Sequence, residues 1–182
     1  MDSPVTEGGI RLIAFYRDGA RDDAGRTLDE ILAWPDDELE SVHDFIQWFF
    51  PLLERSGANP AAPVLDENTI RAFRNTARMQ ERMRRAFLRM LAFYGLTWTE
   101  GRVARAADFE NRAENWLWPS NHNHLRITRM LRSLGLLGLE AESVAFFHAL
   151  DLIYQNFPQR ITARTFAFWR DAALPFSSPQ RD

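Results

Sequence analysis

The sequence contains no cysteine and no lysine, and none of its uncharged stretches is long. Without cysteine the chain cannot form a disulfide, a thiolate metal site or a cysteine nucleophile. Its longest uncharged stretches, such as 90–99 and 115–125, span only ten or eleven residues, whereas a membrane-spanning helix needs about 20. The N-terminus carries acidic residues, unlike the basic start of a signal peptide. These absences predict a cytoplasmic protein without a membrane span.

Aromatic residues, by contrast, are plentiful: the 182 residues include 6 Trp, 14 Phe and 3 Tyr. They can fill a real hydrophobic core, which excludes disorder as a description of the whole chain. The length suits one domain, or one domain with a small appendage. We expect an N-terminal segment over 1–26 that could be partly helical, a helical domain over 27–172 and a C-terminal tail over 173–182.

Helix signals recur along the chain. Thr27-Leu-Asp-Glu30 has the spacing of a capping box. Asp66 is placed to cap a long helical pattern that ends at Gly95, and Thr162 is placed to cap the last helix. No period-two alternation is long enough to predict a strand. The sequence therefore predicts an all-α domain of six to eight helices with no sheet.

Charge is distributed unevenly along the sequence. Residues 1–69 carry 5 Arg against 15 acidic residues, whereas residues 70–132 carry 13 Arg against 5. All 22 basic residues are arginine. Codon bias would explain this, and so would selection for bidentate recognition of carboxylate or phosphate, which arginine provides and lysine does not. Because of this uneven charge, the basic segment 70–132 could bind an anionic partner, or it could fold against the acidic N-terminal third.

Six arginines of the 66–95 pattern share one side of the expected helix, at about 100° per residue. We call this set the arginine face: Arg71, Arg74, Arg78, Arg82, Arg85 and Arg89. One interpretation is a solvated face, or one docked on the acidic residues Asp36, Asp37, Glu38 and Glu40. The alternative is a binding surface for nucleic acid or another polyanion.

Signatures of catalysis and of metal binding are missing. The sequence has no Gly-rich phosphate loop, no G-x-S-x-G elbow and no H-E-x-x-H motif. His122 and His124 lack further ligands at zinc-site spacing. Asp108, Glu110 and Glu114 could offer paired carboxylates, but helical acids at such spacings are usually solvated. We predict a protein that is not an enzyme and has no cofactor and no metal site.

Three segments together resemble a known family. They are HDFIQWFFPL at 43–52, MLAFYGL at 90–96 and NHLRITRMLRSLGLLGLE at 123–140. In this order they resemble the conserved N-terminal domain of the opioid growth factor receptor family, over roughly 27–156 with a looser continuation to 172. The resemblance implies the family's fold and, from its animal members, binding of the pentapeptide Met-enkephalin.

Two groups of residues within these segments are candidate contacts for a peptide or protein segment: His43, Gln47 and Trp48, and Asn123, Arg126 and Arg129. The first group combines polar and aromatic side chains on an amphipathic surface, although Trp48 could equally belong to the core. The second group lies near an expected helix N-terminus, where arginines and backbone N–H groups can receive a carboxylate or phosphate. It could equally form a buried ion-pair network.

Overall fold

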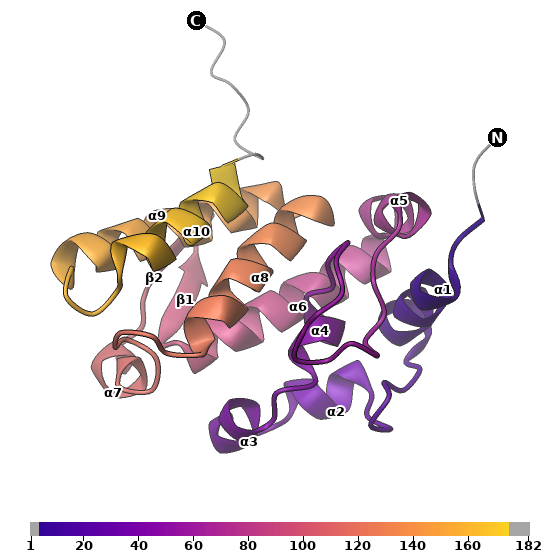
Figure 1. Ribbon diagram of the computed structural model, residues 1–182, viewed down its shortest axis with the longest axis horizontal. Helices are drawn as coiled ribbons and strands as arrows, with labels where there is room; N and C mark the ends of the chain where they lie inside the picture. Colours follow the sequence, from indigo (N-terminus) through magenta and orange to yellow (C-terminus); the bar gives the residue numbers. More distant parts are fainter. Residues whose placement is uncertain (1–3, 175–182) are drawn as a thin grey trace, which may run out of the picture. The chain divides into compact units, whose positions relative to one another are not determined.

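The computed structural model describes residues 4–174, which form ten α-helices, one π-helical segment and a two-stranded antiparallel sheet (Figure 1). In chain order the elements are α1 (Glu7–Ile13), η1 (Ala14–Asp18), α2 (Leu28–Leu32), α3 (Asp36–Ser41), α4 (Ile46–Phe49), α5 (Glu67–Asn75), α6 (Ala77–Phe93), β1 (Leu96–Thr99), β2 (Arg102–Arg105), α7 (Phe109–Ala113), α8 (Asn123–Leu136), α9 (Glu140–Asn156) and α10 (Ala163–Ala173).

These elements fall into two compact units. Unit one comprises the chain up to Arg89 together with Leu136–Gly138, and unit two comprises Met90–Gly135 and the chain from Leu139 onward. The division lies inside α6. Each unit is described by itself below.

Unit one has an aromatic core. The hydroxyl of Tyr16 donates to the carbonyl oxygen of Phe49 and lies 3.3 Å from the sulfur of Met83. The ring of Tyr16 packs edge-on against Phe73, and Phe15 packs against Trp48 with ring centroids 5.2 Å apart. All these side chains are almost completely buried. The core therefore joins η1 to α4, α5 and α6.

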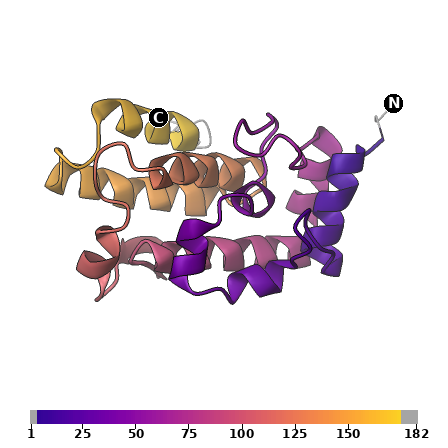
Figure 2. The ribbon, with the colours of Figure 1, turned by 60° about the horizontal axis from the view of Figure 1, so that its bottom comes forward.

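The start of α5 is tied to the start of α1, and the two helices lie side by side (Figure 2). Asp66 caps α5 by accepting from the backbone N–H of Thr69 at 2.7 Å. The same carboxylate accepts from the N–H of Thr6 at 2.9 Å and from its hydroxyl at 2.6 Å. Burial raises the pKa of Asp66, but the hydrogen bonds from Thr6 and Thr69 outweigh it and lower this pKa to about 2.

This pKa predicts acid sensitivity. The folded state lowers the pKa of Asp66 from its ordinary value of 3.8. Asp66 therefore contributes fully to the stability of the fold when the pH is above 3.8. The contribution is lost as the pH falls from about 4 through about 2. We expect roughly 1 kcal/mol from this group, since solvent screens a partly exposed carboxylate. Urea denaturation between pH 2 and pH 5 tests this. Asp66→Asn should flatten the pH dependence of the free energy of unfolding. If the variant and the unmodified protein gave parallel curves of stability against pH, Asp66 would not be the source of the acid sensitivity.

Unit two is built on α8, α9, α10 and the β1–β2 hairpin. The indole N–H of Trp169 on α10 donates to the carbonyl oxygen of His124 on α8 at 3.1 Å. Ser143 on α9 donates to the carbonyl oxygen of Leu131 on α8 at 2.8 Å. Strand β2 packs along α9, and α10 lies beside α9 (Figure 1). The hydrogen bonds are buried, so they fix how these helices pack.

The hairpin corrects the prediction of a sheet-free fold. Strands β1 and β2 pair in the register Leu96↔Arg105 to Thr99↔Arg102. Their turn, Glu100-Gly101, has φ angles of +50° and +77°, as a two-residue type I′ hairpin requires. Each strand has only four residues, which is too short for a period-two pattern to stand out.

The number of helices was also predicted wrongly: ten α-helices form over residues 4–174 instead of six to eight. The pattern from Asp66 to Gly95 is two helices, because Thr76 has an extended backbone with φ −112° and ψ 104°. Within the N-terminal segment over 1–26, residues Glu7–Ile13 form α1. Within the expected tail over 173–182, residues 175–182 lie outside the described residues.

Candidate functional site

The first predicted group lies around α4 in unit one. His43 is exposed, whereas Gln47 and Trp48 are buried. Trp48 packs against Phe15, and the guanidinium of Arg11 lies 5.0 Å from the centre of its ring. Trp48 is thus part of the unit-one core, and a ligand at this surface would meet mainly polar atoms.

Gln47 has an unusual environment for a buried amide. Its side chain is only 4% exposed, and its Nε2 makes a long 3.4 Å hydrogen bond to Ser56 Oγ. Among the described residues, its Oε1 has no hydrogen-bond donor. Buried carbonyl groups are nearly always paired, because burial without a partner costs free energy. Gln47 Oε1 is therefore an enclosed acceptor without a donor among the described residues.

The second predicted group lies at the start of α8 in unit two. Asn121 accepts from the backbone N–H of Asn123 at 2.7 Å and so begins the helix. Arg126 donates to Oδ1 of Asn123 at 3.2 Å, and the hydroxyl of Tyr94 lies 3.5 Å from the same oxygen. Asn123 and Arg126 are buried, and Arg129 is half-buried. The two predicted groups thus belong to different units.

Arginines of the arginine face form ion pairs inside unit one. Arg82 and Arg85 both pair with Asp29, at 2.9 and 3.1 Å. Arg89 pairs with Asp36 at 2.7 Å and donates to the carbonyl oxygen of Trp34.

The remaining members of the face are divided between α5 and α6. Arg71 and Arg74 lie on α5, and Arg74 donates to the carbonyl oxygen of Leu136 at 3.0 Å. The pKa of Asp18 is lowered by the hydrogen bond from Arg17 and, to a smaller extent, by the charge of Arg78. Three of the six arginines of the face therefore pair with two acidic residues of the N-terminal third, Asp29 and Asp36. This agrees with the docked interpretation and gives the nucleic-acid alternative no support.

His124 has a structural environment. Its Nε2 lies 3.0 Å from the carbonyl oxygen of Trp116, and the ring of Trp169 stands edge-on to it at 5.3 Å. Burial lowers the pKa of the imidazole. Within residues 4–174 no group of three or more His, Asp or Glu side chains is placed to hold a metal ion, and no helix is long and apolar enough to cross a membrane.

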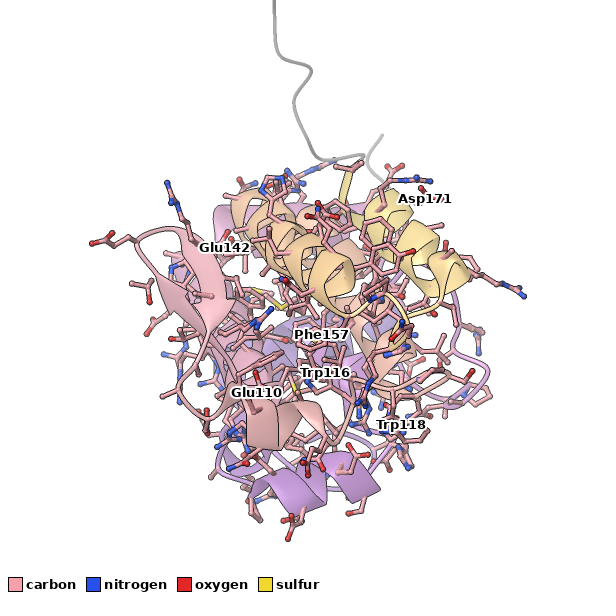
Figure 3. The ribbon with its side chains drawn as sticks, turned by 90° about the vertical axis from the view of Figure 1, so that its left-hand side faces the viewer. Glu110, Trp116, Trp118, Glu142, Phe157 and Asp171 are labelled. Carbon is pink, nitrogen blue, oxygen red and sulfur yellow. The ribbon has the colours of Figure 1, made fainter. Side chains whose placement is uncertain are left out.

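Unit two also has a surface hollow that the sequence analysis did not single out. Its volume is about 210 Å³. It lies between α7 and the segment that joins α9 to α10, on the side of unit two seen in Figure 3, where Glu110 and Phe157 are labelled. Its lining residues are Glu110, Asn111, Ala113, Glu114, Leu117, Phe157 and Arg160.

The only sequence signal for this hollow is the spacing of Glu110 and Glu114, one helical turn apart. Asp108, the third acid of that set, pairs instead with Arg112. The other wall comes from Phe157 and Arg160, more than 40 residues further along the chain. A pairing over that separation depends on the packing of α9 and α10, so local patterns do not reveal it.

Comparison with known proteins identifies the family. The family model described as "Opioid growth factor receptor (OGFr) conserved region" matches residues 12–172. The chain is 41% identical to the human opioid growth factor receptor over 156 residues, which are 80% of this chain and 23% of the relative. It is 42% identical to the mouse receptor over 143 residues, 74% of this chain and 22% of that protein.

A second type of relative is the mouse opioid growth factor receptor-like protein 1, which is 41% identical over 122 residues, 64% of this chain and 26% of that protein. The chain spans about a quarter of the length of these relatives. No solved structure matches it. The family match begins at residue 12, near the end of α1, and so starts ahead of the segments that first carried the resemblance. With nearly the whole described chain covered, the protein belongs to the opioid growth factor receptor conserved-region family.

Proposed function

We propose that this chain is a non-enzymatic, opioid growth factor receptor-like domain that recognises a peptide or protein segment. The relatives are named receptors, which supports a binding role. The single observation that carries the proposal is the buried, unpaired Oε1 of Gln47. A peptide backbone offers N–H donors at every non-proline residue. One such donor would satisfy this oxygen once the Gln47 side chain turns toward the surface, because Oε1 is enclosed in the structure.

Each unit has its own group of candidate contacts. In unit one they are the exposed His43 and the amide of Gln47, supported from below by Trp48. In unit two they are Asn123, Arg126 and Arg129, and the two guanidinium groups suit a carboxylate of the ligand. The arginine face is left out of the proposal, because its partners lie largely within unit one.

A matched pair of glutamine variants tests the proposal, with Met-enkephalin as the probe. Gln47→Leu removes the acceptor at similar volume. We expect it to weaken binding about three- to tenfold, the equivalent of one hydrogen bond. Stability should stay unchanged or rise, because a buried unpaired polar atom is lost. Tryptophan fluorescence and calorimetry measure the affinity, and urea denaturation measures the stability.

Gln80 provides the control. Its Nε2 donates to the carbonyl oxygens of Phe73 at 2.8 Å and Leu137 at 2.6 Å, so its role is structural. Gln80→Leu should therefore lower the free energy of unfolding by about 1–3 kcal/mol and leave the affinity of the folded protein unchanged. Equal affinity of Gln47→Leu and the unmodified protein would contradict the assignment of Gln47.

A further inference from the structure

We propose that the hollow between α7 and the α9–α10 connection binds a small zwitterion of the amino-acid class with an apolar side chain. This site lies wholly in unit two and is independent of the proposed function. It is defined by the lining residues given above. Three features of the hollow support this: its small volume, the charged residues in its walls and the apolar residues at its base.

Size comes first. Sites for drug-sized ligands have volumes of about 300–1,000 Å³. A hollow of about 210 Å³ is smaller than these. It suits a single amino acid or a ligand of that size better than a folded partner or an extended peptide.

The charges come second. Glu110 and Glu114 are one turn apart on one side of α7, where like charges repel by a few tenths of a kcal/mol. Arg160 faces the same hollow from the α9–α10 connection. Within residues 4–174 none of these three side chains forms an ion pair or hydrogen bond. Opposite charges that line one hollow without pairing across it leave room for a ligand that carries both: an ammonium for the carboxylates and a carboxylate for the guanidinium.

The floor comes third. Ala113 and Leu117 are both 6% exposed, and Phe157 is half-buried. Together they give the hollow an apolar base between its charged walls. The guanidinium of Arg105 lies 5.2 Å from the centre of the Phe157 ring and 4.9 Å from that of Phe109. An apolar floor suits an aliphatic or aromatic side chain.

The test uses three probes with the same side chain and different charges: L-phenylalanine, its amide without the carboxylate, and its N-acetyl derivative without the ammonium. Binding is followed by the backbone amide signals of α7 in two-dimensional NMR. We expect L-phenylalanine to saturate with a dissociation constant of roughly millimolar order, because exposed ion pairs contribute little each. The amide and the N-acetyl derivative should each bind about two- to fivefold more weakly.

Variants assign each charge. Glu110→Gln with Glu114→Gln should weaken L-phenylalanine and its amide but not the N-acetyl derivative. Arg160→Gln should weaken L-phenylalanine and the N-acetyl derivative but not the amide. Glu100→Gln, at the exposed hairpin turn outside the hollow, should change none of them. Absence of saturable shifts in α7, or equal binding of all three probes, would overturn the proposal. Since Met-enkephalin is not used, this outcome is separate from that of the Gln47 experiment.

Discussion

Trp169→Ala is expected to lower the free energy of unfolding by about 3–5 kcal/mol, the usual cost of removing a large buried aromatic side chain. Trp169 is 0% exposed. Its indole N–H donates to the carbonyl oxygen of His124, and its ring packs edge-on against the imidazole. Alanine would leave a cavity between α10 and α8 and would remove this buried donor. Urea denaturation measures the loss, and amide hydrogen exchange should show that α10 loses protection first.

The adjacent residue supplies the control. Phe168 has the same kind of side chain but is 50% exposed, with the guanidinium of Arg164 at 5.7 Å from its ring. Phe168→Ala should therefore cost less than about 1 kcal/mol, as exposed substitutions usually do. If the two alanine variants were equally stable, Trp169 would not be the residue that holds α10 in place.

Gly9→Ala is expected to destabilise the protein by about 1–3 kcal/mol, although alanine normally favours a helix. A Cβ atom at Gly9 would collide with the hydroxyl of Thr69 and would lie 2.7 Å from Oδ2 of Asp66. These atoms belong to the hydrogen-bond network that joins α1 to α5. The substitution would therefore force the two helix starts apart.

Gly8 tests the steric reason directly, because it lies in the same helix one residue earlier. A Cβ atom there would meet Pro63 at 3.4 Å, which is an ordinary contact. Gly8→Ala should be neutral or stabilise the protein by up to about 1 kcal/mol through helix propensity. Thermal and urea denaturation should show a loss of stability for Gly9→Ala and none for Gly8→Ala, and equal losses for the two variants would contradict the account.

Local signals in the sequence predicted the helix ends well. Thr27 and Glu30 form the predicted capping box, and Thr162 accepts from the backbone N–H of Thr165. Gly95 follows the end of α6 with φ +74°. These features depend on residues three or four apart, so the sequence contains all the information they need.

Features that depend on distant residues were not predictable in the same way. The sequence named Asp36 among four acidic residues on which the arginine face could dock, and it did not indicate that Asp29 pairs with both Arg82 and Arg85. The unpaired oxygen of Gln47 depends on the path of the loop that carries Ser56. The hollow of unit two depends on the packing of α7 against a connection more than 40 residues away.

The most direct test of the central claim is an NMR titration of the isotopically labelled protein with Met-enkephalin. The account predicts saturable shifts that include the side-chain amide signals of Gln47, at micromolar or tighter affinity. The signals of α7 around Glu110 and Glu114 should not move, because the hollow is a separate site. An unchanged spectrum at millimolar peptide would contradict peptide recognition by this domain and would leave its receptor relatives as evidence of ancestry alone.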